Sequence, residues 1–142
     1  MAKMGANWDF SQVLLDGPRH FVGVVATTGE DFNAAPEIFA DISEVSKIDE
    51  VTQLAATVFA IEEVWYDIQG YTAVNIRFDD NDPDTIPITL SGNGYLDFRD
   101  IGGIKDPKNT GFTGDIKIQT VPATPAATAT LHLKMKLKKK AA

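Results

Sequence analysis

The sequence predicts an all-β protein, a single antiparallel β-sandwich of about eight or nine strands. Thr72–Phe78 alternates Val74, Ile76 and Phe78 with polar residues, as a strand with one buried face does. Similar short runs are separated by clusters of Gly, Pro, Asn and Asp, which is typical of sandwiches and barrels. No internal repeat or linker divides the chain. We expect a jelly-roll-like strand order, with an immunoglobulin-like sandwich as the alternative.

The length and composition fit one domain over residues 1–142, large enough to bury a real core. The chain is 44% hydrophobic and 23% charged, which is ordinary for a globular protein. It contains no Cys, which excludes disulfides, thiolate metal sites and a Cys nucleophile. Because no apolar run is long enough to span a membrane and the N-terminus lacks an apolar signal core, we expect synthesis in the cytoplasm and no membrane partner.

Strand signals in the first half of the chain begin with the apolar segment Trp8–Leu15, which a turn at Asp16–Pro18 ends. The β-branched and aromatic residues of His20–Ala26 predict a second strand. Glu37–Val45 alternates apolar and polar residues and predicts a third. In Ser46–Ala56, apolar residues recur every three positions behind a serine that can cap them, which favours a short helix.

In the second half, Val58–Ile68 reads as the most buried strand because most of its residues are apolar. Ile86–Leu90 and Tyr95–Phe98 are short strands, and the linking Ser91–Gly94 predicts a hairpin between them. Ile101–Thr113 is a glycine-rich loop. The remaining expected segments are the strand Gly114–Gln119, the connector Val121–Ala127 and the strand Thr128–Leu137, whose apolar and polar residues alternate throughout.

Charge is distributed unevenly along the chain. All 20 acidic residues lie in residues 1–115, whereas residues 116–142 hold six Lys and no acid. The acidic body argues against a nucleic-acid partner, which needs clustered cations. The basic end predicts contact with an acidic partner or with the acidic body of a neighbouring copy, and the alternative is an edge strand kept soluble by its charges. The interface candidates are Lys134, Lys136, Lys138, Lys139 and Lys140, with residues 138–142 as a basic tail.

Aromatic residues supply a second group of interface candidates. Trp65 and Tyr66 are adjacent in a predicted strand, so one ring should point inward and the other outward. Tyr66, Tyr71 and Tyr95 could form an exposed face for stacking on a sugar or for a protein partner. The alternative is that these rings complete the sandwich core and its rim.

The acidic run Asp79–Asp84 invites comparison with a calcium loop, because Ca²⁺ takes several oxygen ligands on a flexible segment. The standard twelve-residue loop does not fit, since Thr85 stands at the position of the required Gly and Ser91 at that of the distal Glu. A solvated turn explains the same residues. We therefore expect no metal site.

Catalytic constellations are sparse in this sequence. His20 and His132 are the only imidazoles, and no G-x-S-x-G elbow accompanies them. Glu62 and Glu63 should point to opposite faces of a strand and so not act together. We therefore expect no enzymatic activity and no cofactor.

The runs VWYDIQG, GYLDFRDIGGIKDP and TGDIKIQT, followed by a Lys-rich last strand, resemble small virion structural proteins of tailed bacteriophages. The resemblance covers Asp16–Pro18 and Ile61–Lys140. It implies a capsid decoration or cement protein that binds the outer shell of the virion and stabilises the joints between capsomers. The implied partners are the major capsid protein and further copies of this chain, as dimers or trimers, after synthesis in the host cytoplasm.

For such a protein, residues 1–10 are expected to act as a docking arm, since a free terminal segment carrying Trp8 and Phe10 can order on a partner. A different class of function stays open, a receptor-binding or carbohydrate-binding sandwich that uses exposed tyrosines and the Ile101–Thr113 loop. A head–tail or tail component is a third possibility.

Overall fold

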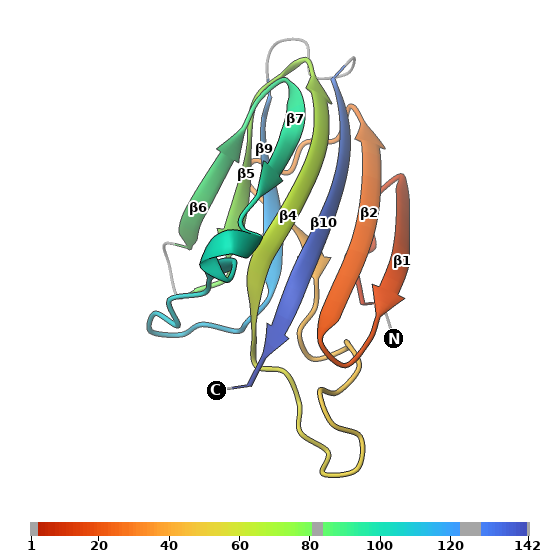
Figure 1. The fold of residues 1–142 in the computed structure, drawn as a ribbon. Helices are drawn as coiled ribbons and strands as arrows, with labels where there is room; N and C mark the ends of the chain where they lie inside the picture. The colour runs from red at the N-terminus through yellow and green to blue at the C-terminus, as the bar shows by residue number, and fades with distance from the viewer. Residues whose placement is uncertain (1–2, 81–83, 123–128, 142) are drawn as a thin grey trace.

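The computed structural model of the chain describes residues 3–80, 84–122 and 129–141, which form two antiparallel sheets packed face to face (Figure 1). The larger sheet contains, in order, β1 (Phe10–Asp16), β2 (His20–Thr28), β10 (Thr130–Lys140), β4 (Val58–Gln69) and β7 (Asn93–Asp97), with β8 (Ile104–Lys105) also paired to β4. The smaller sheet contains, in order, β3 (Glu37–Ala40), β9 (Ile116–Pro122), β5 (Tyr71–Phe78) and β6 (Thr85–Leu90). The predicted all-β sandwich is confirmed.

The strand pairing is nested, which is the topology of a jelly roll. β2 pairs with β10, β3 with β9, β4 with β7 and β5 with β6. The chain therefore behaves as one long antiparallel ribbon that is rolled so that its successive strand pairs lie alternately in the larger and the smaller sheet. β1 adds a further strand beside β2, at the edge of the larger sheet. The expected jelly-roll order holds over the immunoglobulin-like alternative.

The core lies between the two sheets and follows from alternation along their strands. On β10, Leu131, Leu133, Met135 and Leu137 are buried, while the lysines between them reach outward. This confirms the alternation read from the sequence. β4 is buried from Val58 to Val64, in agreement with its expected place at the centre of the fold. The largest fully buried aromatic side chains are Phe21, Phe39, Phe59 and Phe78.

The segment 41–57 corrects the prediction of a helix at Ser46–Ala56. It forms a loop that extends below the sandwich in Figure 1. Asp49 and Leu54 pair as an isolated bridge, and the Asp49 carboxylate accepts a hydrogen bond from the Val51 amide at 2.9 Å. This local bonding closes a turn at the position where the three-residue spacing had suggested a helix. The strand expected over Glu37–Val45 is also shorter than predicted. It ends at Ala40, and residues 41–45 belong to the loop.

The linker Ser91–Gly94 also departs from the prediction. β6 and β7 lie in different sheets, so the linker crosses between the sheets and does not close a hairpin. Turn residues indicate where the chain reverses, but they do not specify which strand the next one pairs with. The strands assigned to the described residues number ten, one or two more than expected, and β8 is only two residues long.

A few predictions fall on residues outside the described part of the chain. These are the first two residues of the expected docking arm, residues 81–83 of the acidic run, residues 123–127 of the connector, Thr128 of the last strand, and Ala142 of the basic tail.

Candidate functional site

The outer face of the larger sheet brings together most of the residues proposed for the interface. Lys134 on β10 pairs across the sheet with Trp65 on β4, and Trp65 pairs with Tyr95 on β7. The Lys134 ammonium lies over the indole ring, 4.5 Å from its centroid, and the Trp65 and Tyr95 rings are 5.2 Å apart. Lys134 is therefore engaged in a cation–π contact in the free protein.

Lys136 lies against two glutamates of β4. Its Nζ is 3.9 Å from a carboxylate oxygen of Glu62 and 3.9 Å from one of Glu63. The expectation that these glutamates point to opposite faces is wrong, because the register shifts where Lys136 pairs with Glu63 and the next residue pairs with Ile61. Such a bulge leaves Glu62 as the extra residue and turns both carboxylates toward one lysine.

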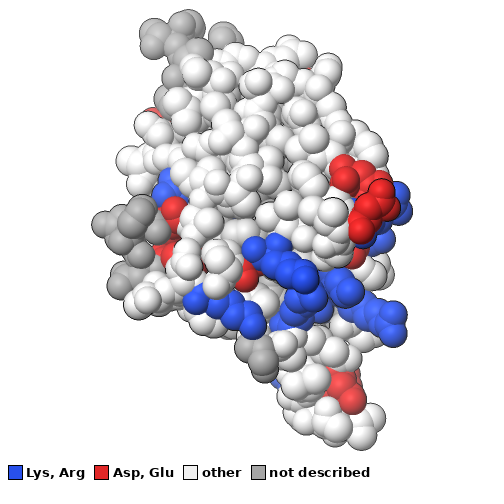
Figure 2. Space-filling model, turned by 60° about the vertical axis from the view of Figure 1, so that its left-hand side comes forward, with Lys and Arg blue, Asp and Glu red and all other residues white. Residues whose placement is uncertain are grey.

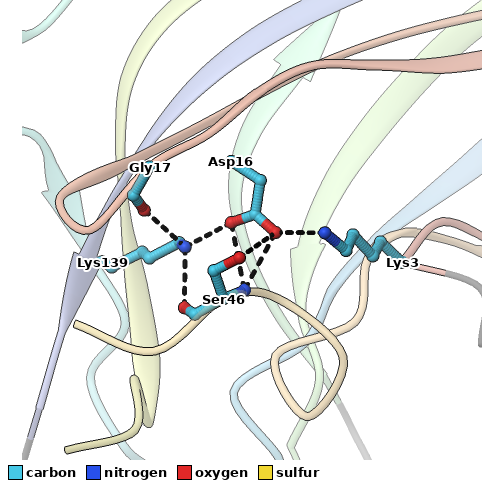
Figure 3. Close-up of polar contacts among 5 residues, drawn as sticks. All are labelled: Lys3, Asp16, Gly17, Ser46 and Lys139. Atoms are coloured by element: carbon cyan, nitrogen blue, oxygen red, sulfur yellow. Dashed lines mark hydrogen bonds and ion pairs between the residues drawn. The ribbon is translucent and has the colours of Figure 1, made fainter. Parts of the chain in front are cut away.

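Lys139 corrects the prediction of an exposed basic tail. The strand β10 continues to Lys140, and Lys139 falls on its inward face, where its side chain is fully buried. Its ammonium pairs with Asp16 and donates to the carbonyls of Gly17 at 2.7 Å and Ser46 at 2.8 Å (Figure 3). All three protons of the ammonium thus have acceptors, which is what a buried Lys requires.

Asp16 is the acceptor at the centre of this network (Figure 3). It also pairs with Lys3 at 2.5 Å and accepts hydrogen bonds from the amide and hydroxyl of Ser46. Burial raises the pKa of the Asp16 carboxyl, but hydrogen bonds from Lys139, Lys3 and Ser46 outweigh burial and hold the pKa at about 2. The network joins the β1–β2 turn, the last strand and the base of the 41–57 loop.

Lys138 and Lys140 are partly exposed and form no ion pair with any other residue that the structure describes. Lys138 pairs across the sheet with Ala60, and Ala60 pairs on its other side with Lys105. Figure 2 shows Lys and Arg side chains gathered low on the sandwich, next to the projecting loop. Of the five candidate lysines, these two have ammonium groups without a charged or aromatic partner in the described part of the chain.

The expected docking arm is corrected at Trp8. Its indole is buried against Phe32, with ring centroids 5.1 Å apart, and it donates a hydrogen bond to the Ile38 carbonyl at 3.0 Å. The described part of the N-terminal segment is therefore anchored in the core by Met4 and Trp8. Phe10, at the start of β1, is half exposed and stays available to a partner.

The three tyrosines do not form one exposed face. Tyr71 is buried and its hydroxyl donates to the Glu30 carbonyl at 2.7 Å, which corrects the expectation of an exposed ring. Tyr66 is half-buried and packs against the core, so the outward position of the pair belongs to Trp65. Tyr95 is exposed and its hydroxyl donates to Glu63 at 2.5 Å; this hydrogen bond, the first of several causes, raises its pKa to about 12.

Apart from Phe10, two apolar features of the surface were missed in the sequence. β1 presents Phe10, Leu14 and Leu15, each about half exposed, at the edge of the larger sheet. Val51 is 93% exposed at the tip of the projecting loop. Apolar residues normally predict burial, so only the strand order identifies which of them are left at an edge. The β-bulge between Val13 and Leu15 accompanies the exposure of these side chains, but it can be recognised only once the pairing of β1 with β2 is known.

The remaining polar groups give limited support for other chemistry. His20 Nε2 lies 3.0 Å from Glu62, and His132 is exposed on the outer face, as expected from its place in the last strand. A shallow hollow of about 270 Å³ lies beside Trp65 and His132. Within the described ranges, no group of three or more His, Cys, Asp or Glu side chains could hold a metal ion. Nor does this part of the chain contain a helix long and apolar enough to cross a membrane.

The fold and these surfaces define a jelly-roll β-sandwich whose most conspicuous features are an apolar edge strand and a projecting loop. The sequence matches no protein-family model, and comparisons with curated proteins and with solved structures also gave no match.

Proposed function

We propose that this chain is a bacteriophage virion structural protein that decorates the outer shell of the capsid and stabilises capsomer joints. The sequence resemblance is the starting point, and the jelly-roll fold is compatible with it, since this fold recurs in capsid and lectin domains. Fold analogy alone does not define a function. The proposal therefore depends on a specific surface by which the chain could bind the shell.

The observation that carries the proposal is the β1 edge. β1 pairs on one side only, with β2, and has no charged side chain before Asp16. Its Phe10, Leu14 and Leu15 side chains are half exposed. An unpaired strand edge of this kind can accept an extended segment of a partner through main-chain hydrogen bonds, while the apolar side chains supply contact area.

The other three sheet edges are less suited to strand addition. β6 contains Pro87, β3 is four residues long and follows Pro36, and β7 ends at the Asp97–Arg99 ion pair of 2.8 Å. Proline, short length and charge all oppose pairing with an added strand. We therefore place the shell segment on β1, with Phe10 as the candidate that both sequence and structure support.

The projecting loop offers a second contact to the shell or to another copy. Val51 is held at its tip by the Asp49–Leu54 bridge, and Leu54 is also exposed beside it. A preordered apolar tip loses little conformational entropy on binding. Two modest contacts per copy, repeated in dimers or trimers over a symmetric shell, would add up through avidity.

The test is a binding assay with capsids that lack this protein. Purified chain is mixed with such capsids, and co-sedimentation and imaging are followed by heating or shear of the loaded shells. The proposal expects saturable binding at a fixed ratio to the major capsid protein, with loaded shells surviving treatment that opens bare ones. Phe10→Asp and Leu15→Asp should each weaken binding by at least tenfold, because they place a charge on the proposed contact.

Ile86→Asp on β6 is the matched control, since Ile86 is exposed to a similar extent on a different edge. It should bind as the unchanged chain does. Increasing salt distinguishes the role of the basic surface, and Lys138→Glu with Lys140→Glu should reduce any salt-sensitive part. Absence of shell binding, with the chain found at the tail or on host glycans, would contradict the proposal.

A further inference from the structure

The projecting loop holds an apolar side chain almost fully in solvent. Val51 at its tip is 93% exposed, and Leu54 beside it is also exposed. The tip is ordered, because the Asp49 carboxylate accepts hydrogen bonds from the amides of Val51 at 2.9 Å and Thr52 at 3.3 Å. An apolar side chain that is presented in this way gains by being covered, and it loses little conformational entropy when a partner covers it.

A pocket of about 360 Å³ lies at the base of the same loop. Its apolar lining comes from both ends of the loop and from the segment before β9, and consists of Ile42, Val45, Ala55, Ala56 and Phe112. An apolar cavity of roughly 150 Å³ can hold a benzene molecule, so this pocket has room for an aliphatic side chain. Val51 does not fill the pocket of its own chain, because it is exposed at the tip.

The tip and the base of the loop carry opposite charges. Glu50 is exposed next to Val51, and Lys47 lines the pocket. Neither charged side chain forms an ion pair within the described ranges. The pocket adjoins the basic end of β10, since the Thr57 amide donates to the Lys140 carbonyl at 2.8 Å. Figure 2 shows acidic side chains on the loop and Lys and Arg side chains above it, so tip and base are complementary in charge.

We propose that a second copy of this chain covers the loop, with Val51 of each copy seated in the pocket of the other. Because tip and pocket belong to one loop, two loops that lie side by side in opposite directions form both contacts about one two-fold axis. Each Glu50 then approaches Lys47 of the other copy. The inference rests on the proposed function in that it names the partner of the loop contact, but it is tested without capsids, so its failure is distinct from a failure of shell binding.

Sedimentation velocity of the purified chain measures this association. A contact limited to two loops is small, so we expect a Kd on the order of 0.1 mM, and protein at roughly 10 µM to 1 mM should pass from monomer to dimer. Val51→Asp should raise the Kd at least tenfold, because it places a charge in an apolar pocket. Ile86→Asp, an equivalent change at an exposed position on β6, should leave the Kd unaltered.

Charge reversal tests the reciprocal arrangement. Lys47→Glu alone and Glu50→Lys alone should each dimerise more weakly than the unchanged chain, since like charges then meet at both contacts. An equal mixture of these two variants should form a heterodimer more tightly than either variant pairs with itself, because every Glu then faces a Lys. A monomer at all concentrations, a trimer, an unaltered Kd for Val51→Asp, or a mixture that associates no better than the single variants would overturn the proposal.

Discussion

At the scale of single residues, Lys139 was predicted to lie in an exposed basic tail, but its side chain is buried. The alternation that places Leu131 to Leu137 inward continues for one more step, and that step is a lysine. Its burial is possible because Asp16 and two carbonyls surround the ammonium. The cost of burying a charge is offset only when partners of this kind are in place.

We expect Lys139→Met to lower the free energy of unfolding by about 3 kcal/mol, since among the described residues it leaves the buried Asp16 paired with Lys3 alone. Urea unfolding measures the change. Lys138→Met, one residue earlier and partly exposed, should stay within about 0.5 kcal/mol. The double variant Lys139→Met with Asp16→Asn should recover part of the loss. Equal effects of Lys138→Met and Lys139→Met would contradict the assigned network.

Asp115 predicts a pH dependence. Its carboxylate accepts a hydrogen bond from the Ile42 amide at 2.9 Å, but burial outweighs this bond and raises its pKa to about 6. Because the folded pKa is raised above the ordinary 3.8, Asp115 favours the folded state below about pH 4, and this contribution is lost as the pH rises through 6. Asp115→Asn should therefore be more stable at pH 7 by about 1 kcal/mol, discounted for solvent screening.

Denaturant unfolding at pH 3.5, 5 and 7 tests this prediction, with the exposed Asp100→Asn as the control. The advantage of Asp115→Asn should fall to zero at the lowest pH. An advantage that does not change with pH would mean that another feature of the substitution is responsible.

At the scale of elements, the base of the projecting loop meets the start of β9 at Gly114. Gly114 has a positive φ of 91°, and an added Cβ would lie 2.1 Å from the Thr57 carbonyl oxygen. No side chain fits there without displacing backbone. Gly92 also has a positive φ, of 68°, but an added Cβ would meet nothing within 4 Å. A side chain at Gly92 would meet backbone strain alone, whereas a side chain at Gly114 would meet both backbone strain and a steric clash.

We expect Gly114→Ala to lower the free energy of unfolding by more than about 3 kcal/mol, whereas Gly92→Ala should cost about 1 kcal/mol. Chemical denaturation of both variants gives the comparison. A similar cost for the two would show that the loop does not pack against β9 as described.

Strands in which apolar and polar residues alternate regularly could be predicted from the sequence. Features that depend on contacts with other parts of the chain could not. β5 and β10 alternate cleanly, because one face of each covers the core. Ser46–Ala56 has helical spacing, but the Asp49 carboxylate bonds the local backbone and closes a turn instead. The bulge at Glu62 was not predictable either, since it exists only in relation to β10.

At the scale of the whole molecule, the nested pairing places the last strand at the centre of the larger sheet. β10 pairs with β4 along its whole length and with β2 from Thr130 to Lys138, whereas β1 pairs on one side only. The larger sheet therefore cannot be completed until β10 is available, and contacts between residues distant in sequence dominate the fold.

Hydrogen exchange should reflect this arrangement. Amides of β10 and β4 should exchange only by global unfolding, while amides of β1 and of the 41–57 loop should exchange faster, because local opening exposes them at lower cost. Exchange followed by mass spectrometry measures each segment. Protection of β1 equal to that of β10 in the isolated chain would show that its edge is already covered, as in a stable oligomer.

The candidate surface was partly predictable at this scale. Lys134 reaches outward as predicted by the alternation of Thr128–Leu137, whereas the outward positions of Lys138 and Lys140 follow from the extension of β10 into the expected tail. The prediction assigned Trp8, Tyr71 and Lys139 to the surface, but all three are buried. For the two aromatic residues, residue type alone does not distinguish an interface side chain from a core side chain. The exposure of Leu14 and Leu15 follows from the position of β1 at an edge, which is a property of the strand order.

The sequence by itself determined that the chain is all-β and which face of its regular strands is apolar, since these depend on local periodicity and composition. Only the tertiary structure decided the jelly-roll order, the burial of Lys139 with Asp16, and the hydrogen bond between Asn109 and Thr85. Each of these joins residues far apart in the chain, and the free energy of such contacts depends on partners that local sequence does not specify.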